Sequence, residues 1–137
     1  FRQVGQAGAP LYISYEGESM YKLVILIETP EDETAFADEW PLFLFWAERM
    51  PGLRRETTSH VEKMLFGYTR YSQIHELYFD SLEDLKAAMN TEEGRLAGKQ
   101  LQKMTHGRVI LFIANHQEDD LERIRRYTQS HETTQPG

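Results

Sequence analysis

The chain has 137 residues, a length that fits one domain with its own hydrophobic core, and it carries a net charge of −7. It contains no cysteine, which excludes disulfides, thiolate metal ligands and cysteine nucleophiles and favours a reducing, cytoplasmic location. The acidic balance argues against a nucleic-acid partner, and no apolar run approaches the roughly 20 residues that a membrane span requires. We therefore expect neither nucleic acid nor membrane as a partner.

Residues 1–19 predict an N-terminal arm. Residues 1–10 are rich in glycine, alanine and glutamine, a composition typical of loose structure. Leu11–Tyr15 alternates residue types that favour a strand. This segment is either an extra strand beside the next one or an appended tail. The main domain is expected at residues 20–116.

Tyr21–Glu28 predicts the first strand of that domain. Both of its faces are largely apolar, which indicates a strand covered on both sides. A helix is expected over Asp32–Arg49, because the acidic residues at its start suit a helix N-terminus. Pro41 lacks the backbone N–H that a helix interior needs, so we expect a kink or a restart there. Gly52 is placed to end the helix in the left-handed conformation.

The later elements are expected in the order strand, strand, helix, helix, strand and terminal helix. Their predicted positions are Arg54–Leu65, Ser72–Phe79, Ser81–Asn90, Thr91–Met104, Val109–Ala114 and Asp119–Tyr127. Arg54–Leu65 is polar on both faces, which suits an edge strand, and Val109–Ala114 is almost fully apolar. Residues 117–137 are expected to form a C-terminal helix followed by a flexible tail.

This order predicts an α+β fold of the split βαβ, or ferredoxin-like, type. In that fold a four-stranded antiparallel sheet carries helices on one face. The first and last strands, however, are apolar on both faces. Something must therefore cover the second face, and another copy of the same sheet satisfies this requirement. We expect a two-fold homodimer in which two sheets face each other.

Several segments between Met20 and Asn115 form a pattern found in a known family. They are Tyr21-Lys22-Leu23-Val24, Phe36 with Trp40, Met50-Pro51-Gly52-Leu53-Arg54, Glu76-Leu77-Tyr78-Phe79-Asp80-Ser81-Leu82 and Thr91-Glu92-Glu93-Gly94. Together they resemble the EthD-like family of the dimeric α+β barrel superfamily. The resemblance implies two subunits that form one barrel, with a cavity for a small hydrophobic or aromatic molecule. It also implies that the chain is a catabolic enzyme or an accessory protein, and many members of the family need no metal or organic cofactor.

The first helix departs from the family pattern. Many members carry a His-x-Pro-Leu segment there, and Phe43 and Phe45 stand at the positions of its histidine and proline. Any activity that depends on that histidine is therefore not expected in this chain. The departure favours the alternative of a non-catalytic ligand-binding module. A structural dimerisation module is a further alternative.

The third strand supplies the main candidates for chemistry. His75, Leu77 and Phe79 are assigned to the helix-covered face, because Phe79 directly precedes a helix that needs an apolar neighbour. Glu76 and Tyr78 then point into the barrel. A carboxyl group in an apolar cavity would have a raised pKa and would act as a general base. The alternative for Glu76 is a structural ion pair with Arg54, Lys22 or Lys63.

His60 completes the candidate catalytic set with Glu76 and Tyr78. The candidate ligand-binding residues are Lys22, Trp40, Phe43 and Trp46, although aromatic residues at helical spacing are more often part of a core. His60, His75 and His106 lie on or near different strands, but their spacing supports no metal site. We therefore expect no metal, and the resemblance to the EthD-like family implies that no organic cofactor is needed.

Overall fold

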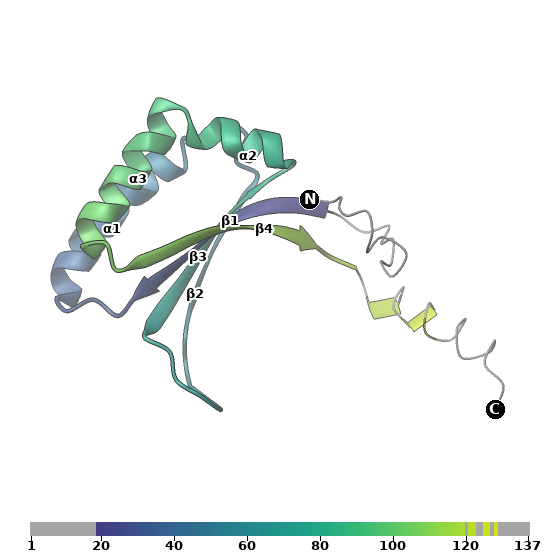
Figure 1. Cartoon of the computed structure of the whole chain (residues 1–137), viewed down its shortest axis with the longest axis horizontal. Coiled ribbons are helices and arrows are strands. Elements are labelled where there is room, and N and C mark those ends of the chain that lie inside the picture. Colours follow the sequence, from purple (N-terminus) through teal and green to yellow (C-terminus); the bar gives the residue numbers. More distant parts are fainter. Residues whose placement is uncertain (1–18, 120, 123–124, 127, 129–137) are drawn as a thin grey trace. The chain divides into compact units, whose positions relative to one another are not determined.

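The computed structural model describes residues 19–119, 121–122, 125–126 and 128 (Figure 1). Residues 20–116 form a compact unit of their own, and they contain nearly all of the sheet and its helices. The strand expected at Leu11–Tyr15 and the flexible tail lie outside the described residues, and the terminal helix at Asp119–Tyr127 is described only in part.

Four strands form one antiparallel sheet in the spatial order β2-β3-β1-β4. The strands are β1 (Ser19–Glu28), β2 (Arg55–His60), β3 (Tyr71–Phe79) and β4 (Val109–Gln117). β3 lies between β2 and β1 and pairs antiparallel with both. β2 and β4 are therefore the two edges of the sheet.

Three helices lie on one face of this sheet (Figure 1). They are α1 (Glu33–Ala47), α2 (Leu82–Met89) and α3 (Glu92–Thr105). Each begins at a polar N-cap whose side chain accepts a hydrogen bond from the backbone N–H three residues later: Asp32, Ser81 and Thr91. The predicted ferredoxin-like α+β fold is confirmed.

The hydrophobic core lies between the helices and the sheet. Its buried residues include Leu23, Ile25, Ile27, Phe43, Ala47, Leu77, Phe79, Leu85, Leu101 and Met104. The strand residues in this set alternate along β1 and β3, as expected for one face of a sheet. Leu77 and Phe79 therefore face the helices, as predicted, and Glu76 and Tyr78 project from the opposite face. We call that opposite side, which α1, α2 and α3 leave uncovered, the open face.

Two predicted strand ends were wrong, and the restart expected at Pro41 does not occur. α1 continues through Pro41 as a single helix, because packing of its aromatic side chains against the core outweighs the loss of one backbone hydrogen bond. β2 ends at His60 rather than at Leu65. β4 continues past Ala114 to Gln117, which brings His116 into the sheet.

β4 leaves four consecutive apolar side chains accessible. Ile110, Leu111, Phe112 and Ile113 are each 40–45% exposed. An exposed apolar strand at the edge of a sheet is a surface that usually meets a partner. None of the described helices is long and apolar enough to cross a membrane.

Candidate functional site

Strand pairing arranges the polar residues of the open face in two rows. In the first row Tyr78 of β3 lies between Lys22 of β1 and Arg55 of β2. In the next row Glu76 lies between Val24 and Thr57. Residues opposite each other on neighbouring strands have Cβ atoms about 5 Å apart, so the side chains within these rows meet.

Glu76 is the centre of this group. Lys22 Nζ lies 2.8 Å from Glu76 Oε2. The hydroxyl groups of Tyr78 and Thr57 each donate a hydrogen bond of 3.1 Å to Glu76 Oε1. The side chains of Lys22 and Glu76 are only 17% and 19% exposed. We refer to Lys22, Thr57, Glu76 and Tyr78 as the Glu76 cluster.

The ring of Tyr78 is enclosed by cationic and aromatic groups. The guanidinium carbon of Arg55 lies 4.2 Å from the ring centre, and Lys22 Nζ lies 5.3 Å from it. The ring of His116, from β4, meets Tyr78 edge-on with centroids 5.0 Å apart. Tyr78 is 4% exposed. The cluster and its surroundings therefore draw on all four strands.

The charges of Lys22 and Glu76 reinforce each other. Partial burial acts to raise the pKa of Glu76, but hydrogen bonds from Lys22, Tyr78 and Thr57 outweigh it and leave this pKa below its usual value. Burial likewise acts to lower the pKa of Lys22, yet the interaction with Glu76 raises it. The predicted upward shift for Glu76 is therefore wrong. The alternative, an ion pair with Lys22, is confirmed, whereas Arg54 contacts Asp80 at 3.6 Å.

His60 lies apart from Glu76 and Tyr78. It is the last residue of β2, is exposed, and pairs with Gln73 of β3. Because side chains alternate along a strand, His60 shares a face with Glu56 and Thr58, the helix side of the sheet. Within one subunit it therefore cannot join Glu76 and Tyr78 in one site.

The candidate ligand-binding residues are divided by the sheet. Lys22 lies on the open face, whereas Trp40, Phe43 and Trp46 belong to α1 on the other side. Phe43 is 2% exposed and is part of the core, with Trp40 and Trp46 packed against it. A single molecule within one subunit cannot contact both groups. The three aromatic residues therefore pack the helix layer onto the sheet.

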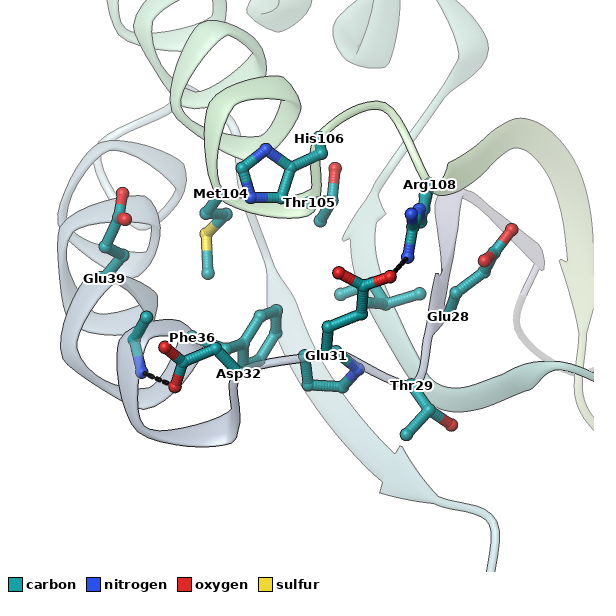
Figure 2. Close-up of a pocket in the computed structure, with 13 residues that line it drawn as sticks. Glu28, Thr29, Glu31, Asp32, Phe36, Glu39, Met104, Thr105, His106 and Arg108 are labelled. Atoms are coloured by element: carbon teal, nitrogen blue, oxygen red, sulfur yellow. Dashed lines mark hydrogen bonds and ion pairs between the residues drawn. The ribbon is translucent and has the colours of Figure 1, made fainter.

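A hollow with a volume of about 110 Å³ lies near the end of β1 (Figure 2). Its walls come from residues 27–32, the first half of α1, the end of α3 and Arg108. All four acidic side chains in it already have partners. Glu28 lies 3.8 Å from Arg70, and Glu39 accepts a hydrogen bond of 3.1 Å from Gln100. Glu31 pairs with Arg108 at 2.8 Å, and Asp32 accepts a hydrogen bond of 3.0 Å from the N–H of Ala35. The cavity contains none of the ligand-binding residues expected from the sequence.

The histidines do not converge. His75 is buried beneath α1, His106 ends α3 in the left-handed conformation, and His60 is exposed on β2. Among the described residues, no group of three or more His, Cys, Asp or Glu side chains is placed to hold a metal ion.

Three residues in and around the Glu76 cluster were not anticipated from the sequence: Arg55, Thr57 and His116. The first two lie on a polar strand, so no hydrophobic pattern specifies which β3 residue each one faces. The third lies beyond the predicted end of β4. The run of apolar residues from Val109 onward contained no signal for a strand that continues to Gln117.

Comparisons with known proteins identify the family. No protein-family model and no curated protein matches the sequence. Among solved structures, the chain is similar to an ethyl tert-butyl ether D (EthD) family protein from Bacillus halodurans C-125. The two share 30% sequence identity with a TM-score of 0.65, over 74% of this chain and 99% of that one. The chain belongs to the EthD family.

More distant structures share the fold of this EthD family member. A dimeric ferredoxin-like protein from Jannaschia sp. CCS1 matches with 17% identity and a TM-score of 0.53, over 70% of this chain and 97% of that one. SnoaB, a cofactor-independent oxygenase from Streptomyces nogalater, matches with 10% identity and a TM-score of 0.50, over 76% and 95% of the two chains.

Proposed function

We propose that this EthD family protein binds a small hydrophobic or aromatic molecule against the open face of its sheet, in a barrel cavity that a second copy of the chain closes. The observation that carries the proposal is the Glu76 cluster. A few polar groups held in fixed positions on a largely apolar surface are typical of small-molecule sites, where they orient the ligand. Val24, Leu26 and Ile74 share the open face with the cluster.

The second copy is supported by β4. Two of its exposed apolar side chains, Ile110 and Phe112, alternate onto the open face together with His116. They form a surface that water disfavours, at roughly 25 cal/mol for each Å² of apolar area. Several proteins of similar fold are described as dimeric. In a two-fold dimer the same surface of each subunit contacts its copy, so one exposed strand per subunit can supply both halves of the interface.

In this proposal the Glu76 cluster acts as a polar anchor. Lys22 and the guanidinium of Arg55 present positive charge beside the aromatic ring of Tyr78. Such a group favours a ligand that combines an aromatic ring with an anionic or strongly electronegative substituent. The depressed pKa of Glu76 keeps its carboxylate ionised at neutral pH, which holds Lys22 in place beneath the ligand.

A second candidate is a cofactor-independent catabolic enzyme or its accessory protein. The observation in its favour is the ionised Glu76 carboxylate, which can accept a proton and lies 3.1 Å from the hydroxyl of Tyr78. The same low pKa makes Glu76 a weak base. Binding is therefore the function that the geometry supports best, and proton transfer would require a ligand of unusually acidic C–H or O–H.

A fluorescent probe tests the binding proposal. 8-Anilinonaphthalene-1-sulfonate combines aromatic rings with an anionic group and becomes fluorescent in apolar sites. We expect the wild-type protein to bind it saturably and Lys22→Met to weaken the affinity several-fold. Lys63→Met, which removes an exposed lysine from the loop after β2, is the matched control. Failure of the wild-type protein to bind, or equal affinities for the two variants, would contradict the proposal.

A further inference from the structure

His75 is a buried polar residue that the proposed ligand site does not use. Its side chain is completely inaccessible and lies between β3 and α1. The rings of Trp40 and Phe43 meet it edge-on, with centroids 5.0 and 5.7 Å away. A buried imidazole requires hydrogen-bond partners for both of its nitrogen atoms.

Both partners come from the edge strand β2. Thr58 Oγ1 lies 2.8 Å from His75 Nδ1. Glu56 Oε2 lies 2.7 Å from His75 Nε2. These two residues flank Thr57, so the side chain of His75 spans two alternate residues of β2. Backbone pairing from Arg55 to His60 aligns this short, polar edge strand along β3. The two hydrogen bonds of His75 add side-chain contacts that hold β2 in this place.

Thr57 points to the other side of the sheet and donates its hydroxyl to Glu76. Consecutive residues of β3, His75 and Glu76, are thus tied to consecutive residues of β2 from opposite faces. Any shift of β2 that loosens Glu56 and Thr58 from His75 also moves Thr57 away from Glu76. The residue two positions before Thr57 on the open face, Arg55, moves with it.

We infer that His75 is a positioning residue for the open-face ligand site, which it serves from the opposite side of the sheet by fixing β2 so that Thr57 and Arg55 reach Glu76 and Tyr78. The expected effect of His75 on ligand binding rests on the proposed function. The expected effect of His75 on the pKa of the Glu76 carboxyl does not depend on any ligand.

The neutral state of the His75 imidazole keeps its hydrogen bonds to β2 intact near neutral pH. Burial lowers the pKa of His75 to about 4, although the charges of Glu48 and Glu76 act in the opposite direction. Burial and a hydrogen bond with Glu48, at the end of α1, raise the pKa of Glu56 to about 7. The other side chains against the imidazole, Trp40, Phe43 and Thr58, are uncharged.

Either protonation state of Glu56 preserves both hydrogen bonds. An ionised Glu56 accepts the Nε2 proton while Thr58 donates to Nδ1. A protonated Glu56 that donates its proton to Glu48 still accepts the Nε2 proton, so neither hydrogen bond of His75 is lost.

The test uses His75→Phe, which keeps an aromatic ring against Trp40 and Phe43 but removes both hydrogen bonds. The pKa of the Glu76 carboxyl is measured by carbon-detected NMR in the absence of ligand. We expect it to rise by roughly 0.5–1 pH unit as the hydrogen bond from Thr57 weakens. His60→Phe, at the exposed end of the same strand, is the control and should leave the Glu76 pKa unchanged.

Thr58→Val is the second variant, because it removes one hydrogen bond at an exposed position and carries little risk to folding. It should raise the Glu76 pKa in the same direction by a smaller amount. An unchanged Glu76 pKa in a folded His75→Phe protein, or in Thr58→Val, would overturn the inference. If the pKa rises but wild-type protein does not bind 8-anilinonaphthalene-1-sulfonate, the positioning role stands and the proposed function fails.

Discussion

His75 and Glu76 are neighbours in β3 whose side chains leave the sheet on opposite faces and are both hydrogen-bonded to β2. His75 Nε2 lies 2.7 Å from Glu56, and Glu76 Oε1 lies 3.1 Å from the hydroxyl of Thr57. This pairing connects the buried helix side of the sheet with the polar cluster on the open face. It makes the edge strand β2 the element on which the site geometry depends.

Replacing Lys22 should destabilise the protein in a pH-dependent way. Lys22→Met leaves the partly buried Glu76 carboxylate without its cation, at a cost of about 1 kcal/mol near pH 7. Glu76 has a depressed folded pKa, so its contribution to stability is present above its unfolded pKa and is lost as the pH falls through the folded value. Urea unfolding at pH 7 and pH 3 measures the difference.

The destabilisation by Lys22→Met should therefore be smaller at pH 3 than at pH 7. Lys63→Met should show no loss at either pH, because Lys63 is exposed. An equal loss for Lys22→Met at both pH values would mean that packing of the lysine stem, rather than its charge, is responsible.

His75 and Glu56 should each make the free energy of unfolding depend on pH, and the two dependences should have opposite signs. Each is seen by itself when the other residue is replaced. The lowered pKa of His75 makes the protein less stable as the pH falls from 6.5 toward 4. The raised pKa of Glu56 makes it less stable as the pH rises from 4.5 through about 7. In the wild-type protein the two effects largely cancel between pH 4.5 and 6.5, because folding moves one proton from the histidine to the glutamate.

Single substitutions reveal these two slopes. Glu56→Gln leaves the histidine effect, so its free energy of unfolding should increase from pH 4.5 to pH 6.5. His75→Phe leaves the glutamate effect, so its free energy of unfolding should decrease over the same interval. Denaturant unfolding at several pH values measures both. Slopes of the same sign in the two variants would show that the two residues do not share a proton in this way.

The faces of β3 follow from the sequence, whereas the neighbours of Glu76 on β2 do not. Alternation along residues 72–79, together with the helix that follows Phe79, is sufficient to place His75 inside and Glu76 outside. Thr57 and Arg55 meet β3 only through the register of a polar strand, and register is weakly specified where neither face is apolar. The lowered pKa of Glu76 depends mainly on Lys22 and Tyr78, which the sequence had placed beside it, and to a smaller extent on Thr57, which it had not. Of the two interpretations open for Glu76, the structure supports the ion pair.

Pro41 shows that local propensity can be outweighed by packing. Its local effect on a helix is unfavourable by about 3 kcal/mol, and that cost alone predicted an interruption. Trp40 and Phe43, on either side of it, pack against His75 and the core. Contacts of this kind are made with distant parts of the chain, and their sum holds α1 together as one helix.

Gly94 should tolerate no larger residue. A Cβ atom at this position would lie 2.3 Å from the backbone oxygen of Ala88, because α2 and α3 follow each other closely. Gly94→Ala should lower the free energy of unfolding by roughly 2 kcal/mol or more. Gly98→Ala, in the same helix but with open space around the added atom, should stabilise it by up to about 1 kcal/mol. Thermal melting of both variants compares them, and equal shifts would contradict the close approach.

The exposed strand β4 should mediate the proposed homodimer. Phe112→Asp places a charge on its most exposed apolar residue and is expected to produce monomers in sedimentation at micromolar concentration. Leu42→Asp is the matched control, since Leu42 on α1 is 47% exposed compared with 45% for Phe112. A monomeric wild-type protein, or a dimeric Phe112→Asp variant, would argue against the proposed barrel.

Ligand binding on the open face is tested most directly by an NMR titration of the wild-type protein with 8-anilinonaphthalene-1-sulfonate. We expect saturable shift changes at Lys22, Val24, Glu76 and Tyr78, because these residues lie together on that face. Changes confined to the hollow formed by residues 27–32 and the end of α3, or the absence of saturable changes at the Glu76 cluster, would contradict the proposed site.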